Sequence, residues 1–163
     1  FYRGMVNKYG WVDMGSSFLP SEFNAAYLWA QLEQLDDIQG KRKHIWGRYF
    51  KGLNGKIGNE VKLPVIPDYA TNNAHMFYLI CPSLEYRTAL MKYLKEHDIQ
   101  ATFHYIPLHS SKYYEDKHDG RELPNCNRYG ETLVRLPLFY ELSDMEIDKI
   151  VKHIIRFTTE HVI

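Results

Sequence analysis

ATFHYIPLH, residues 101–109, is a short strand-like run that carries two histidines and a tyrosine and is stopped by a proline. Apolar and polar residues alternate from Ala101 to Tyr105, which is the period of a half-buried strand. Pro107 has no N–H for a sheet ladder, so the strand must end or turn outward there. Because sites are usually built where strands meet loops, His104 and His109 are candidate site residues. Spacing alone favours a plainer interpretation, a hydrogen-bonded strand residue and a loop residue.

Three further strands are predicted on either side of this run. AHMFYLIC, residues 74–81, is apolar enough for a buried strand, and Pro82 breaks it. A short strand is expected near Val61–Val65, among glycines, prolines and asparagines that indicate loops. LVRL, residues 133–136, predicts a last short strand that ends at Pro137.

Helices are predicted between and after these strands. Ser83 can cap a helix that runs to about His97, with Leu90, Met91 and Leu94 inward. Ser143 can cap a final helix whose inner face is Ile147, Ile150, Val151, Ile154 and Ile155. Residues 110–130 are polar and predict a long surface loop. The order of elements predicts a small α+β fold, in which a mostly antiparallel sheet has helices on one side.

The first third of the chain predicts a long helical segment. Ser21 is a good N-cap after Pro20, and an apolar stripe follows it, made of Ala25, Leu28, Leu32, Leu35 and Ile38. Gly40 predicts a kink or break, since glycine costs about 1 kcal/mol against alanine inside a helix. Helical character resumes over residues 41–53, so 21–53 is expected to be a helix pair or one long bent helix.

Loop residues between 54 and 73 mark the best domain boundary. We therefore expect residues 1–58 to form one region and residues 59–163 a C-terminal α+β domain. Upstream, Gly15-Ser16-Ser17 is a turn rich in hydrogen-bond donors that can present N–H groups and hydroxyls to an anion, as phosphate cradles do. An ordinary approach to the helix N-cap remains the simpler interpretation of that turn.

Composition narrows the function classes. The 163 residues contain 20 Lys and Arg against 20 Asp and Glu, and this balance argues against a nucleic-acid or anionic-membrane surface. Apolar runs are too short to cross a bilayer, and no secretory leader opens the chain, so we expect a cytoplasmic protein. The first residue is Phe1, which we take as the sign of a truncated or processed piece.

Two chemistries can be weighed from residue types alone. His104, His109, His118 and Cys126 could suggest a metal, but their spacing matches neither a helical zinc motif nor a paired-cysteine ribbon, so no metal site is expected. A cysteine nucleophile lacks any flanking motif. Cys81 and Cys126 are expected to be reduced, structural thiols.

Three separated segments carry a resemblance to a known family. They are residues 15–33 (GSSFLPSEFNAAYLWAQLE), residues 102–109 (TFHYIPLH), and residues 135–140 (RLPLFY) with Leu142-Ser143 after them. In this order they resemble the pyridoxal-phosphate-dependent sugar aminotransferases of the DegT/DnrJ/StrS family. Residues 74–78 and Arg3-Gly4, Val6, Lys8-Tyr9 and Trp11 are similar to the branch that aminates dTDP-4-keto-6-deoxyglucose to dTDP-4-amino-4,6-dideoxygalactose.

The resemblance implies the C-terminal part of an aspartate-aminotransferase (type I PLP) α/β fold. Residues 1–58 would be the end of the large domain and the long linking helix, and 59–163 the small domain. The Schiff-base lysine and the aspartate on the pyridinium nitrogen would lie upstream of Phe1, so this chain would hold no catalytic residue and be inactive alone. The intact protein would be a homodimer that moves an amino group from glutamate to a dTDP-4-keto-6-deoxy-hexose for surface polysaccharide or lipopolysaccharide biosynthesis.

Site residues also follow from the resemblance. Many members carry an asparagine and an arginine in the turn, where this chain has Ser17 and Leu19. Ser16 and Ser17 are still expected to contact the cofactor phosphate, whereas the arginine's hold on the donor carboxylate must fall elsewhere or be absent. His104, Tyr105 and His109 match the family's His-Tyr-x-Pro-x-His segment and are expected to position substrate.

A different class of function stays open at this point. The chain could be a stand-alone small domain that only binds a partner or a nucleotide sugar. A third hypothesis, a histidine-liganded metal protein, is weaker for the reasons of spacing given above.

Overall fold

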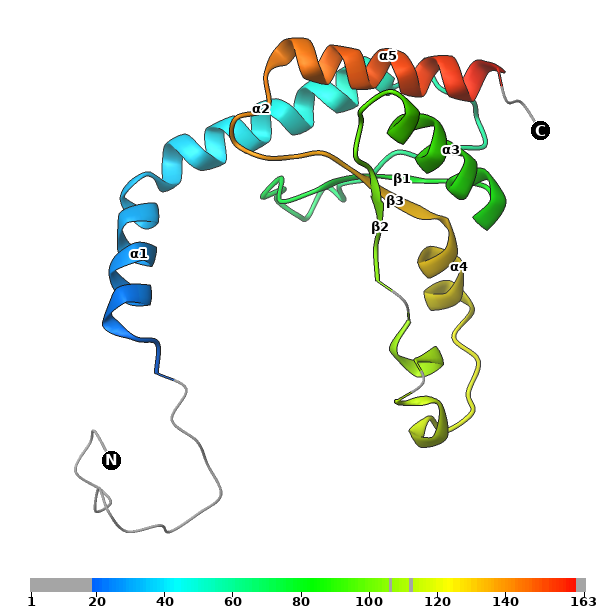
Figure 1. Ribbon diagram of the computed structural model, residues 1–163, viewed down its shortest axis with the longest axis horizontal. Coiled ribbons are helices and arrows are strands. Elements are labelled where there is room, and N and C mark those ends of the chain that lie inside the picture. Colours follow the sequence, from blue (N-terminus) through cyan, green and yellow to red (C-terminus); the bar gives the residue numbers. More distant parts are fainter. Residues whose placement is uncertain (1–18, 106, 112, 161–163) are drawn as a thin grey trace. The chain divides into compact units, whose positions relative to one another are not determined.

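The computed structural model describes residues 19–105, 107–111 and 113–160 (Figure 1). The chain divides into two compact units, one ending at Leu35 and one running from Asp36 onward. The predicted assignment of residues 1–58 and 59–163 to two domains of a larger protein stays a prediction. The predicted turn at residues 15–17 lies outside the described residues.

In the first unit, α1 spans Glu22–Glu33. Ser21 caps it as predicted, since its side chain accepts a hydrogen bond from the Asn24 N–H at 3.3 Å. None of its residues is buried, and its large apolar side chains are exposed: Phe23, Tyr27, Leu28, Trp29 and Leu32. The prediction of a break at Gly40 is wrong, because the interruption falls at Gln34 and Gly40 lies inside the next helix.

The helix α2 spans Leu35–Leu53, so the helix pair predicted over 21–53 is confirmed. The elements that follow are β1 (Phe77–Ile80), α3 (Leu84–Glu96), β2 (Thr102–Phe103), α4 (Pro124–Thr132), β3 (Leu133–Leu136) and α5 (Asp144–Glu160). Single 3₁₀ turns cover Leu108–Ser110 and Glu115–Lys117.

The strands form an antiparallel sheet in the order β1-β3-β2. Phe77 pairs with Leu136 and Leu79 with Val134, and all four are buried. Directly opposed residues of antiparallel strands share a face, so these four side chains make the core face. The alternate residues make what we call the outer face: Tyr78, Ile80, Thr102, Leu133 and Arg135.

Helices α2, α3 and α5 cover the core face (Figure 1). They contribute fully buried side chains at helical spacing, among them Ile45, Tyr49 and Leu53 from α2, Leu90 and Leu94 from α3, and Ile147 and Ile154 from α5. The predicted fold class, a small antiparallel sheet with helices on one side, is confirmed.

Local signals account for where α3 and α5 begin. Ser83 accepts a hydrogen bond from the Tyr86 N–H at 3.2 Å, which confirms the predicted cap. Ser143 and Glu146 form a capping box: the Ser143 N–H donates to the glutamate at 2.8 Å, and the Glu146 N–H donates to Ser143 Oγ at 3.3 Å.

Three predictions of local structure are wrong. Residues 61–65 form only an isolated bridge between Lys62 and Ile80. The strand around His104 is limited to Thr102–Phe103, since β3 offers a partner only over Val134 and Arg135. Residues 110–130 are no continuous loop, because Pro124 at the start of α4 supplies a fixed φ that suits the first turn of a helix.

Among the described residues, no helix is long and apolar enough to cross a membrane.

Candidate functional site

The candidate site begins where β2 ends. The strand stops after Phe103, Tyr105 has a positive φ of 24°, and Pro107 redirects the chain. The Pro107 ring packs on Gly130 of α4, where an added Cβ would lie 2.8 Å from the ring carbons Cγ and Cδ. This close approach to α4 fixes the segment that carries the predicted site residues.

His104 and Tyr105 lie side by side on that segment. Their ring centroids are 5.0 Å apart, and the ring planes meet at 60° in an edge-to-face arrangement. His104 is half-buried, and its Nδ1 is buried without a hydrogen-bond partner among the described residues, whereas Tyr105 is 74% exposed. A buried ring nitrogen without a partner costs free energy that a hydrogen-bonding ligand would recover.

His109 is tied to α4. Its Nε2 lies 2.7 Å from Asn127 Oδ1, and since a carbonyl-type oxygen only accepts, the histidine donates. The His109 ring is 5.2 Å from that of His118, whose Nε2 donates to the Arg121 carbonyl at 2.9 Å. His104 and Tyr105 are in contact, and His109, further along the same segment, ties that segment to α4 through Asn127.

Arg135 was missed by the reasoning from sequence. It is half-buried in the middle of β3 on the outer face, opposite Tyr78 on one side and Thr102 on the other. Its Cζ lies 5.9 Å from the centre of the Tyr105 ring. The signal that could have found it is an arginine between two apolar residues of a short strand, which must point away from the core.

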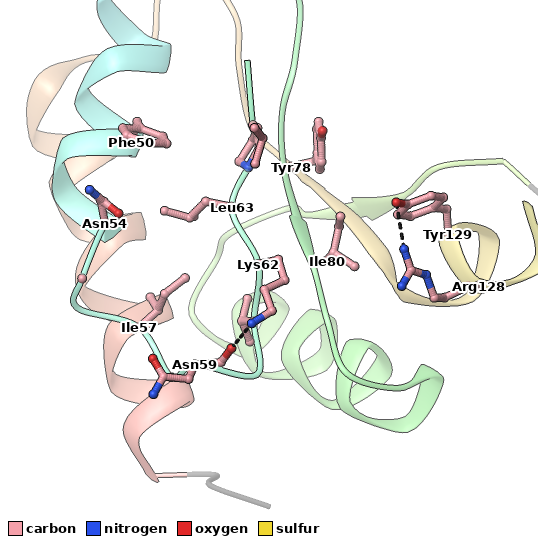
Figure 2. A pocket seen from close by; sticks show the side chains of 15 residues that line it. Phe50, Asn54, Ile57, Asn59, Lys62, Leu63, Tyr78, Ile80, Arg128 and Tyr129 are labelled. Atoms are coloured by element: carbon pink, nitrogen blue, oxygen red, sulfur yellow. Dashed lines mark hydrogen bonds between the residues drawn. The ribbon is translucent and has the colours of Figure 1, made fainter. Parts of the chain in front are cut away.

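A separate groove of 710 Å³ lies at the β1 edge of the sheet, and most of its lining comes from the end of α2 and from residues 54–65. Figure 2 shows Tyr78 and Ile80 of β1 between the α2 end of the groove and Arg128 and Tyr129 of α4. The Lys62 ammonium donates to the Asn59 carbonyl at 2.5 Å, and Arg128 donates to the Tyr129 hydroxyl at 2.8 Å. His104, Tyr105 and His109 are not among the residues that line this groove.

The alternative chemistries find little support in the described part of the chain. No group of three or more His, Cys, Asp or Glu side chains there could hold a metal ion. Burial raises the pKa of the Cys81 thiol to about 12, so it is no thiolate nucleophile near neutral pH. Cys126 is exposed on α4.

One cluster of the described residues offers unpaired polar groups to a ligand. The His104 and Tyr105 rings lie 5.0 Å apart, and the Arg135 guanidinium carbon lies 5.9 Å from the Tyr105 ring. His104 Nδ1 and Arg135 Nε are buried without a hydrogen-bond partner among the described residues. Such groups bind oxyanions and hydroxyls. Ser16 and Ser17, the predicted phosphate contacts, lie outside the described residues.

Comparison with known proteins gives a family and a fold. The model of the DegT/DnrJ/EryC1/StrS aminotransferase family matches residues 2–155. The S. venezuelae protein DesV, solved with a ketimine intermediate, is 26% identical over 98% of this chain, with a TM-score of 0.84.

Two other solved structures show the fold alone, since they are less than 25% identical. The PLP-form of Spr1654 from Streptococcus pneumoniae is 24% identical over 80% of this chain, with a TM-score of 0.70. The sugar aminotransferase CalS13 from Micromonospora echinospora is 19% identical over 77% of this chain, with a TM-score of 0.67. The matches cover 42%, 34% and 32% of the DesV, Spr1654 and CalS13 chains, so this chain spans well under half of their length.

Proposed function

Because the chain belongs to the DegT/DnrJ/EryC1/StrS aminotransferase family, we propose that it is the C-terminal part of a PLP-dependent sugar aminotransferase. The observation that carries this proposal is the family match over residues 2–155, nearly the whole chain. In this proposal, residues 1–58 end the large domain and include the linking helix, and 59–163 are the small domain.

The proposed reaction moves an amino group from glutamate to C4 of a dTDP-4-keto-6-deoxy-hexose. The motif resemblance at residues 74–78 and in residues 3–11 supports this substrate class, and with it a place in surface polysaccharide or lipopolysaccharide biosynthesis. We also propose that the intact protein is a cytoplasmic homodimer. The chain alone should be inactive, because the lysine that holds the cofactor would lie upstream.

Each residue of the site has a proposed task. Ser16 and Ser17 would contact the phosphate of PLP, which when bound supplies the electron sink for amino transfer. His104 Nδ1 is free to hydrogen-bond a sugar hydroxyl or carbonyl, and the exposed Tyr105 phenol can do the same. His109 keeps both in place through its hydrogen bond to Asn127 on α4. These are orienting roles, and they favour the geometry of transfer without moving the proton themselves.

Activity of the full-length protein tests the proposal. The protein would be loaded with PLP and given glutamate and the keto sugar nucleotide, and the amino sugar nucleotide would be followed by mass spectrometry. We expect product from the full-length protein and none from residues 1–163 alone. A full-length protein that binds the nucleotide sugar but makes no amino sugar with any of several amino donors would favour a binding protein instead.

Variants test the site residues. His104→Ala and Tyr105→Phe should raise KM for the sugar nucleotide more than they change the reaction with glutamate alone, which requires no sugar. His153→Gln on α5 serves as a matched control, since this histidine belongs to a different element. Equal effects of all three variants on both half-reactions would contradict the proposed roles.

A further inference from the structure

We infer that Arg135 is an anion-binding residue whose guanidinium holds a carboxylate or phosphate group of a ligand on the outer face of the sheet. The general chemistry follows from the structure alone. The carboxylate of an amino donor and the diphosphate of a nucleotide sugar are the two expected ligands, and this choice rests on the proposed function.

Arg135 occupies an interior position of β3. In β3 its neighbours Val134 and Leu136 are buried in the core, so the arginine side chain lies on the opposite face. Because β3 is the middle strand, the guanidinium is flanked by Tyr78 of β1 and Thr102 of β2. A charged side chain in the centre of a sheet is held by neighbours on both sides and loses much of its hydration.

Arg135 Nε is buried and makes no hydrogen bond with any of the residues that the structure describes. Within the described ranges, Arg135 is the arginine for which no hydrogen bond or ion pair to a protein acceptor is found. The other six each have one: Arg42, Arg48, Arg87, Arg121, Arg128 and Arg156. A half-buried cation without an anion is unfavourable, and a bound anion removes that cost.

An aromatic ring lies beside the Arg135 guanidinium. The Tyr105 ring, 5.9 Å from the guanidinium carbon, shields one side of the charge without neutralising it. His104, whose Nδ1 is also buried without a partner, stands next to Tyr105 with the two rings 5.0 Å apart. The same small region thus holds a free guanidinium, an unpaired imidazole nitrogen and an exposed phenol.

The planar shape of the Arg135 guanidinium decides which class of ligand it binds. A guanidinium presents planar, paired N–H donors that match the two oxygens of a carboxylate or phosphate. The ligand is therefore an oxyanion that approaches between β1 and β2 on the outer face. A neutral sugar ring would leave the charge unpaired.

The test compares Arg135→Gln, Arg135→Lys and the control Arg156→Gln in the full-length protein. Arg156 suits as control because it is exposed on α5 and paired with Glu160 of the same helix at 2.9 Å. Dissociation constants for inorganic pyrophosphate and for glutarate, which cannot react, would be measured by calorimetry. Thermal melts would show that each variant is folded.

We expect Arg135→Gln to weaken one of the two anions about ten- to hundredfold, since a charge-assisted hydrogen bond to an ion is removed. Arg135→Lys should recover part of the loss, and Arg156→Gln should change neither constant. Loss confined to pyrophosphate assigns the residue to the nucleotide diphosphate, and loss confined to glutarate assigns it to the amino donor. Unchanged binding of both anions in a folded Arg135→Gln protein would overturn the inference.

These outcomes are separate from the proposed function. If the full-length protein transfers no amino group but Arg135→Gln still loses pyrophosphate, the anion site stands and the proposed reaction fails. If amino transfer is normal and both anions bind as before in Arg135→Gln, the reaction stands and the role of Arg135 fails.

Discussion

Gly130 lies in α4 at the point where that helix meets the segment carrying His104, Tyr105 and His109. A Cβ added at Gly130 would lie 2.8 Å from Cγ and from Cδ of Pro107. Carbon atoms pack at about 3.5–4.0 Å, so Gly130→Ala creates an overlap that one partner must relieve by moving. A proline ring is rigid, and the backbone on either side of it would have to shift.

Two effects of opposite sign decide the stability of this variant. Alanine is better than glycine in a helix by about 0.8–1.0 kcal/mol, which would stabilise the folded chain. Forcing an extra carbon into a packed contact costs typically 1–3 kcal/mol. Because the contact atoms belong to a ring with no rotamer to escape into, we expect the overlap to dominate and the free energy of unfolding to fall by about 1 kcal/mol.

Gly40→Ala is the matched control. Gly40 is exposed inside α2, and a Cβ built there meets nothing within 4 Å. The same substitution should therefore act through helix propensity alone and raise the free energy of unfolding by about 1 kcal/mol. The free energies of unfolding of the two variants should therefore change in opposite directions and differ by about 2 kcal/mol.

Urea unfolding of the 163-residue chain, followed by circular dichroism, gives the midpoints for both variants. Side-chain NMR signals of His104 and His109 provide a second readout, and they should move in Gly130→Ala and stay in place in Gly40→Ala. The reasoning would be refuted if Gly130→Ala stabilised the chain as much as Gly40→Ala, because α4 would then not pack tightly on Pro107.

Three further outcomes are expected. Tyr49→Phe should lower the free energy of unfolding by about 1–2 kcal/mol in urea titrations, because its buried hydroxyl donates to the carbonyl of the residue after β3 at 2.9 Å. Burial, and after it the charge of His97, lowers the pKa of His153 below the usual histidine value of 6.5. The unfolded chain therefore binds more protons than the folded chain as the pH falls below 6.5, so the free energy of unfolding should fall there. His153→Gln should flatten this pH dependence, measured as the midpoint of urea unfolding. The exposed apolar side chains of α1 should drive self-association of the chain. The double variant Phe23→Glu with Trp29→Glu should abolish this self-association in sedimentation experiments. A wild-type chain that stays monomeric at all concentrations would contradict this prediction.

The periodicity of apolar residues predicted the core of the second unit, because the spacing of apolar residues along a helix or strand decides which side chains are buried. The inner face of α5, from Ile147 to Ile154, and the strand at residues 133–136 required only patterns within a few turns or pleats. Capping by Ser21, Ser83 and Ser143 was readable for the same reason, since each serine bonds to a residue three positions away.

Local signals failed where a distant partner decided the outcome. Residues 61–65 have strand-like residues, but only Lys62 finds a partner in the sheet. The strand at His104 is short because β3 reaches no further along it. Gly40 was expected to break a helix, yet the cost of one glycine is small beside the packing of Ile45, Tyr49 and Leu53 on the core.

The sequence therefore predicted the fold class, the family and the serine-capped starts of α1, α3 and α5, since these depend on short-range patterns and motifs, but it did not predict the start of α4. It also pointed to His104, Tyr105 and His109 through the family motif. The tertiary structure was needed to show that Asn127 bonds to His109, that Pro107 packs on Gly130, and that Arg135 Nε is buried between β1 and β2 without a partner among the described residues. These facts depend on strand register and on the packing of α4, which join residues far apart in the chain.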